Sequence, residues 1–140
     1  YIFTSRSNGS KCTYLTDAGF VTDTIREAVA GSSALVLEAN HDVEMLKNGP
    51  YPRQLKQRIL STLGHLSNDT AGHFLTELER LPEHIVLAHL SEHNNLPQLA
   101  QDTVQNILHD NNRLQETELF VAAQNRVVAD SPLPAVLDLK

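Results

Sequence analysis

Three predicted strands of this 140-residue chain end on side chains that can bind metal ions or transfer protons. The apolar segment "CTYLT" is followed by Asp17, "ALVL" by Glu38 and "IVLA" by His89. A fourth such residue, His65, stands in "GHLSN", directly before a predicted helix. In open α/β sheets, ligands bind outside the carboxyl ends of the strands. Carboxylates and imidazoles serve as metal ligands and as general acids or bases. We therefore predict that these four residues converge on one pocket.

Each of the four residues also has a structural explanation that needs no ligand. Asp17 can be a turn residue, and Glu38 can be a charge at a helix start. His65 can help to end one helix before the next begins, and His89 can be a hydrogen-bonded core histidine. The coincidence of all four favours the functional hypothesis. A zinc pair of His89 and His93 is disfavoured, because "LSEHNN" is predicted to form a loop rather than a helix.

The four residues are placed by alternating strands and helices, which predict an α/β layered fold. A hairpin around Asn8-Gly9 joins the first two strands. Residues 118–130 read as one or two strands around a turn at Gln124-Asn125. The other predicted strands and helices follow from β-branched runs, apolar periodicity and capping residues: strands at 1–5, 12–16, 33–40 and 85–89, and helices at 22–31, 42–49, 53–63, 68–81 and 96–109.

Composition limits the classes of function. The net charge of −6 argues against a domain that holds nucleic acid by charge alone, although bound metal cations can dominate the field of a local site. Cys12 is the only cysteine, which suits a reducing, cytoplasmic compartment. The apolar runs are too short to span a membrane. The sequence contains no Walker loop, no dinucleotide-binding glycine pattern and no nucleophile elbow.

Four segments together resemble the metallo-β-lactamase-fold hydrolases: "LTDAG", "LEANHDVEMLKNGPYPRQLKQRI", "GHLSN" and "LAHLSEHNN". Within that superfamily they are most similar to the WalJ/YycJ-like bacterial nucleases, which are relatives of ribonuclease Z. The resemblance covers residues 10–125. The set of "EANHD", "GHLSN" and "LAHLS" is specific, whereas "TDAG" alone is not.

This resemblance implies a fold, a metal centre and a role for each of the four residues. The family fold is a four-layer αββα sandwich of two similar halves, with two divalent metal ions, zinc or manganese, at the edge between the sheets. Asp17 matches the aspartate that bridges the metals, and His89 matches the last metal-binding histidine. Glu38 and His65 match a catalytic pair in which the glutamate orients the histidine near the scissile phosphate. The implied activity is metal-dependent phosphodiester hydrolysis, with DNA as substrate, cut from a 5′ end; RNA is an alternative.

The chain departs from the family pattern in one large respect, because it lacks the H-x-H-x-D-H motif that supplies most metal ligands. We therefore expect residues 1–140 to be the C-terminal half of the domain, with mixed sheet and helices on one face. On this expectation the chain alone is inactive and poorly metallated, and its partner is the missing half or a second copy. Two other hypotheses remain open: a non-catalytic α/β binding or regulatory module, and the same fold acting on a small ester or thioester.

Overall fold

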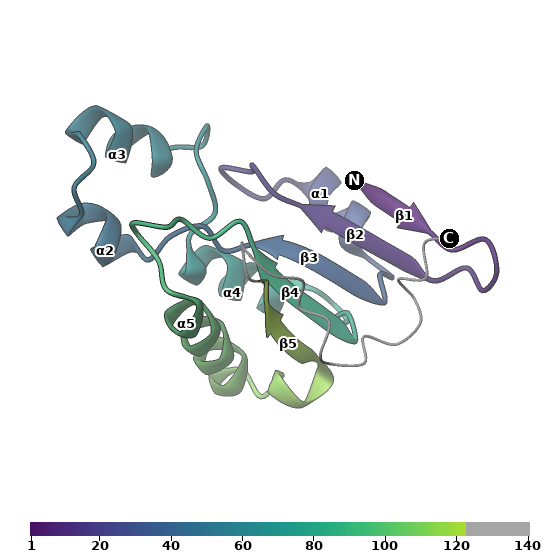
Figure 1. The fold of residues 1–140 in the computed structure, drawn as a ribbon. Coiled ribbons are helices and arrows are strands. Elements are labelled where there is room, and N and C mark those ends of the chain that lie inside the picture. Colours follow the sequence, from purple (N-terminus) through teal and green to yellow (C-terminus); the bar gives the residue numbers. More distant parts are fainter. Residues whose placement is uncertain (123–140) are drawn as a thin grey trace.

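The computed structural model describes residues 1–122, which form a five-stranded mixed sheet with helices (Figure 1). The strands lie side by side in chain order: β1 (Ile2–Thr4), β2 (Lys11–Leu15), β3 (Ala34–Glu38), β4 (His84–Ala88) and β5 (Glu118–Val121). β1 pairs antiparallel with β2, and the other neighbours are parallel. The predicted α/β class is confirmed, and a mixed sheet of this kind is compatible with half of a metallo-β-lactamase sandwich.

Helices form the crossovers between the parallel strands. Between β2 and β3 lies α1 (Asp23–Val29), and between β4 and β5 lie α5 (Pro97–Asp110) and a short 3₁₀ turn (Leu114–Glu116). The connection from β3 to β4 is the longest and contains α2 (Val43–Asn48), α3 (Arg53–Ile59) and α4 (Asn68–Glu77). Because β2 to β5 run in the same direction, their carboxyl ends meet at one edge of the sheet, beside α2 and α3 (Figure 1).

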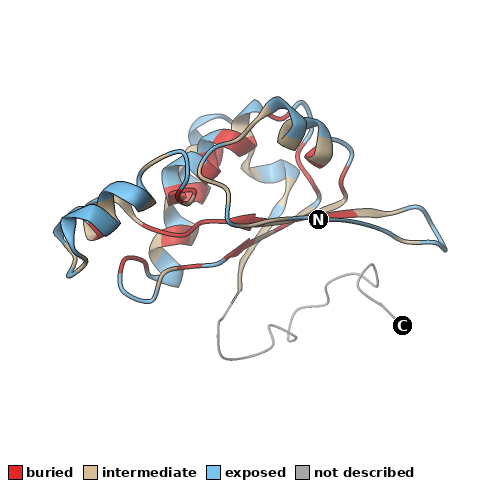
Figure 2. Ribbon diagram, turned by 90° about the horizontal axis from the view of Figure 1, so that it is seen from above, coloured by how far each residue is buried: buried red, intermediate tan, exposed pale blue. Residues whose placement is uncertain are grey.

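The core lies between one face of the sheet and the helices. Leu35, Leu37, Ile85 and Leu87 alternate along the two central strands and are fully buried. They pack with apolar residues of α1, α4 and α5 (Figure 2). Close packing of α4 on α5 depends on Gly72, because a Cβ there would lie 2.6 Å from Ile107 Cδ1. The central strands and these helices therefore form one rigid support for the strand ends.

The opposite face of the sheet is also apolar. Its residues alternate with the core leucines, and the strand register places four of them in one row: Tyr14, Val36, Val86 and Phe120. The side chains in this row are not deeply buried: Tyr14 is 40% exposed, and the other three are partly exposed. β1 forms the adjacent edge, where Phe3 is 48% exposed. Apolar area of this kind usually marks a packing surface.

Two predicted helices are too long. The helix predicted at 53–63 ends at Ile59, and the helix predicted at 68–81 ends at Glu77. In both cases the sequence continues the apolar spacing, but the chain turns toward the sheet. The predicted turn at Gln124-Asn125 lies outside the described residues. Among residues 1–122, no helix is long and apolar enough to cross a membrane.

Candidate metal centre

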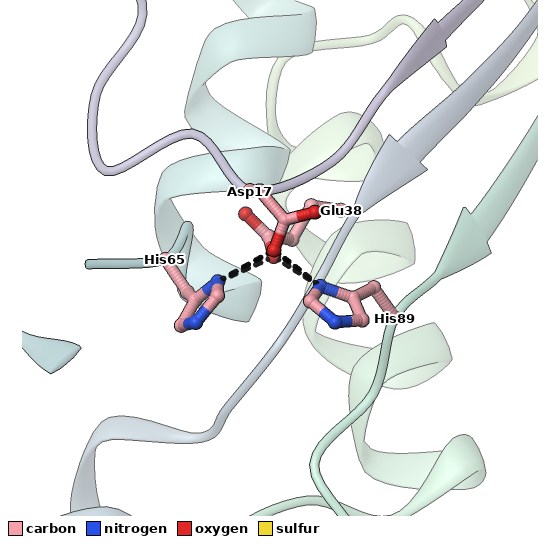
Figure 3. A group of neighbouring side chains, drawn as sticks. All are labelled: Asp17, Glu38, His65 and His89. Carbon is pink, nitrogen blue, oxygen red and sulfur yellow. Dashed lines mark hydrogen bonds and ion pairs between the residues drawn. The ribbon is translucent and has the colours of Figure 1, made fainter. Parts of the chain in front are cut away.

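The structure brings Asp17, Glu38, His65 and His89 together at the carboxyl edge of the sheet (Figure 3). Each offers one potential ligand atom, and these atoms all lie within 4.8 Å of one another. Glu38 is the last residue of β3, while Asp17 and His89 follow β2 and β4. His65 comes from the turn before α4. Parallel strands in register are sufficient to gather the first three, and a separate turn delivers the fourth.

Glu38 is the centre of this group. It is fully buried, and each of its carboxylate oxygens accepts two hydrogen bonds. Oε1 lies 2.8 Å from His65 Nδ1 and 2.6 Å from His89 Nδ1. Oε2 accepts from the backbone N–H groups of Ala18 and Leu66, at 3.2 and 3.1 Å. A buried carboxylate is stable only when it is paired in this way.

This arrangement decides which ring nitrogens of the histidines remain available. A carboxylate only accepts hydrogen bonds, so Nδ1 of both His65 and His89 must carry the proton. Each neutral ring then has its lone pair on Nε2. A carboxylate that holds the Nδ1 proton of an imidazole is the usual support for a metal-binding or proton-transferring histidine. The four contacts of Glu38 are compatible with the predicted orienting role.

Asp17 completes the group from the solvent side. Its side chain is 70% exposed, and Oδ1 lies 3.9 Å from His65 Nδ1 and 3.8 Å from His89 Nδ1. A carboxylate and two imidazole rings are donor types that bind divalent metal ions. The residues present thus fit part of a metal centre. The roles predicted for the four residues remain predictions.

The backbone at the two strand ends is unusual. Asp17 has φ of 59° and His89 has φ of 58°. This left-handed region is uncommon for residues other than glycine, although aspartate, asparagine and histidine tolerate it best. The side-chain amide of Asn40 donates to the carbonyl of His89 at 2.8 Å and so supports the second turn. Backbone conformations of this kind cost free energy and occur most often at functional sites.

A buried pair of asparagines joins the loops that carry the group. Asn68, at the start of α4, and Asn95 exchange two amide hydrogen bonds of 3.0 and 2.8 Å. Asn95 also donates to the carbonyl of Ala39, directly after Glu38. These bonds connect "EANHD", "GHLSN" and "SEHNN". The sequence does not predict this pair, although each of the three motifs contains an asparagine that could have pointed to it.

The turn that delivers His65 depends on close backbone contact. The N–H of His65 donates to the carbonyl of Ile59, at the end of α3, at 3.2 Å. The preceding residue must be Gly64, because a Cβ there would lie 2.0 Å from the same oxygen. The chain then continues to Leu66, whose N–H binds Glu38. This geometry explains why α3 ends earlier than the apolar spacing predicts.

His41 is buried near the four residues but does not join them. It is 1% exposed, and neither of its ring nitrogens has a hydrogen-bond partner among the described residues. Burial lowers the pKa of His41, and the nearby His65 lowers it further. His41 is absent from the candidate ligand group.

A cleft of about 450 Å³ opens from His65 and His89. One side is formed by Tyr51, which precedes α3, and by Leu55 and Ile59 of α3, and the other by the loop after β4. Tyr51 and His93 meet across it, with ring centroids 5.7 Å apart and planes inclined by 45°. The sequence suggests His93 only as a candidate zinc ligand and gives no signal for Tyr51. Their contact joins segments far apart in the chain.

Comparison with known protein families gives no match. Two curated proteins are similar over most of this chain. An exodeoxyribonuclease YycJ of Bacillus anthracis is 41% identical over 105 residues, which are 74% of this chain and 40% of that protein. An exodeoxyribonuclease WalJ of Streptococcus pneumoniae serotype 2 (strain D39 / NCTC 7466) is 42% identical over 119 residues, covering 84% of this chain and 42% of that protein. The chain thus spans about two fifths of the length of the relatives it matches.

Proposed function

We infer that the full-length protein hydrolyses phosphodiester bonds of DNA, because this chain is homologous over most of its length to the metallo-β-lactamase-fold exodeoxyribonucleases YycJ and WalJ. The observation that carries this proposal is the buried Glu38, which holds the Nδ1 protons of two histidines at one sheet edge. A non-catalytic module has no need of two imidazoles with free Nε2 atoms beside an open carboxylate. The relatives are named exodeoxyribonucleases, which supports DNA as the substrate and cleavage from an end of the DNA strand.

Asp17 and His89 are the metal ligands in this proposal. These two residues would hold divalent ions, zinc or manganese, Asp17 through its carboxylate and His89 through Nε2. Such ions polarise phosphoryl oxygens and activate water near neutral pH. A catalytic zinc usually needs three protein ligands, so further ligands must come from elsewhere in the full-length protein. The 140-residue chain alone should therefore bind metal weakly.

His65 acts on the phosphate rather than on the metal. Glu38 keeps the proton on Nδ1 of His65, so Nε2 is the atom that exchanges protons with the substrate. When Nε2 is protonated, it donates to a phosphate oxygen or to the leaving oxygen, and the carboxylate of Glu38 stabilises the charged ring. The 5′ end of DNA is the proposed point of attack.

Metal dependence is the first test of this function. Full-length protein is incubated with duplex DNA labelled at either the 5′ or the 3′ end, with Mn²⁺ or Zn²⁺ added. We expect stepwise nucleotide release from the 5′ end, complete loss of release after chelation, and recovery when metal is restored. A labelled RNA of the same sequence is the parallel substrate. Absence of metal-dependent release from both DNA and RNA would overturn the proposal.

We also propose that another part of the full-length protein covers the apolar sheet face defined by Tyr14, Val36, Val86 and Phe120. The row crosses four strands in register, and the relatives have more than half of their length outside the match. Two sheets that pack face to face bury such rows at a spacing of about 10 Å. On this proposal residues 1–140 are the C-terminal half of the domain.

The isolated 140-residue chain should therefore self-associate, because an uncovered apolar face and a free strand edge drive association. Val86→Lys should reduce that association, since it places a charge in the middle of the row. Gln54→Lys, on the exposed surface of α3, is the matched control and should have no effect. Size exclusion with light scattering measures the oligomer, and elemental analysis measures bound metal. A monomeric chain with two tightly held metals would contradict the half-domain proposal.

A further inference from the structure

Within the proposed nuclease function, we propose that Tyr51 and His93 form a stacking site for the base of the nucleotide whose phosphate lies at His65. Both side chains line the cleft that opens from His65 and His89. The phosphate and the base of one nucleotide would thus occupy adjacent parts of the same cleft. Tyr51 and His93 are binding residues in this proposal and take no part in proton transfer.

The aromatic pair is well placed for this role. Tyr51 precedes α3, His93 belongs to the loop after β4, and their ring centroids are 5.7 Å apart. The two loops meet beyond the strand ends, where α2 and α3 extend away from the sheet (Figure 1). Tyr51 is half-buried and His93 is exposed, so the pair presents ring surface to the cleft. Nucleobases stack on aromatic side chains in many proteins that bind single strands.

The charges of the cleft favour a base over a phosphate in this part of the site. Among the described residues that line it, none is a lysine or an arginine, and Glu92 contributes a carboxylate. Two lysines of α2 and α3 are engaged elsewhere: Lys47 pairs with Glu44 at 2.8 Å, and Lys56 donates to the carbonyl of Lys47 at 2.7 Å. A phosphate would meet repulsion here, whereas a neutral heterocycle would not.

The size and apolar surface of the cleft also suit a nucleotide. Its volume of about 450 Å³ lies within the range of about 300–1,000 Å³ that is typical of small-molecule sites. Leu55 and Ile59 of α3 add apolar surface beside Tyr51. A planar base can therefore contact rings and aliphatic side chains while its sugar-phosphate remains near His65.

Two polar side chains of the cleft, Asn40 and Ser91, already make hydrogen bonds within the chain. The amide of Asn40 is already bound to the carbonyl of His89, and Ser91 Oγ accepts from the backbone and side-chain N–H groups of Asn94. Stacking alone is tolerant of sequence, because every base has a π face. An enzyme that removes nucleotides one after another needs this tolerance, so we expect similar affinity for all four terminal bases.

Binding of single-stranded DNA to the full-length protein tests the proposal without requiring cleavage. Dissociation constants are measured by fluorescence anisotropy in Ca²⁺, for an intact oligonucleotide and for a set in which one abasic nucleotide is moved inward from the 5′ end. Tyr51→Ala should weaken binding of intact DNA about 5- to 150-fold. It should have no effect when the abasic nucleotide occupies the stacking position. Tyr51→Phe should restore binding, since it keeps the ring.

Leu60→Ala is the matched control, because Leu60 is 47% exposed at the end of α3 and does not line the cleft. It should bind all the oligonucleotides as wild type does. If Tyr51→Ala loses the same affinity for intact and abasic DNA at every position, Tyr51 only holds the loops together and the proposal is wrong. Equal binding by wild type and Tyr51→Ala would also overturn it. Tyr51-dependent binding without any cleavage would instead refute the nuclease function while supporting the stacking site.

Discussion

Replacing His89 with alanine should deplete the full-length protein of metal and abolish DNA hydrolysis, whereas the same change at His65 should spare the metal. The two imidazole rings make the same hydrogen bond, since Nδ1 of each binds Glu38 Oε1. They differ in position: His89 follows a central strand, and His65 lies in a turn before a helix. We assign the metal to His89 and the phosphate to His65 on this basis together with the family resemblance.

The expected effects are large and separable. On the proposed roles, His65→Ala removes a single donor to the reacting phosphate, which typically costs about 10²–10³ in rate, and should leave metal content near that of wild type. On the same proposal His89→Ala removes a ligand, so both metal content and turnover should fall. Metal is measured by elemental analysis after buffer exchange, and turnover on end-labelled DNA under single-turnover conditions. Metal loss in His65→Ala with full occupancy in His89→Ala would reverse the two assignments.

Glu38→Gln should leave the protein folded but reduce its affinity for metal. The amide oxygen of glutamine can accept from the backbone N–H groups of Ala18 and Leu66, as Oε2 does now. Its NH₂ group must then face His65 and His89, and it can only donate to them. Both rings would have to present Nδ1 as an acceptor, which moves the proton to Nε2. A protonated Nε2 cannot bind a metal.

We therefore expect Glu38→Gln to remain folded but to lose about 10- to 100-fold in metal affinity, the range for a residue that supports a ligand. Glu38→Ala should also destabilise the fold, because buried donors left without partners cost about 1–3 kcal/mol each. Metal titration, ¹⁵N chemical shifts of the histidine rings and urea unfolding measure the three effects. Glu44→Gln, in an exposed pair on α2, is the control. Wild-type metal affinity in Glu38→Gln would show that Glu38 does not set the tautomers.

The sequence alone was sufficient to locate the central strands and the residues that follow them. Apolar runs, caps and glycines are local signals, so they located β2, β3 and β4 and therefore placed Asp17, Glu38 and His89 at strand ends. The topology of parallel strands then implied a common edge. Helix ends were less accurate, because the stop after Ile59 comes from a backbone contact with the His65 turn and not from a change in apolar spacing.

Only the tertiary structure decided how these residues act on one another. Glu38 is 27 residues from His65 and 51 from His89, and no local pattern shows that one carboxylate oxygen holds both rings. The asparagine pair and the contact of Tyr51 with His93 likewise join segments distant in the chain. Hydrogen-bond partners depend on separations of a few tenths of an ångström, which are set by strand register and by the packing of α4 and α5. Residue types and spacing therefore predict which groups can meet, while the packed core determines which atoms do.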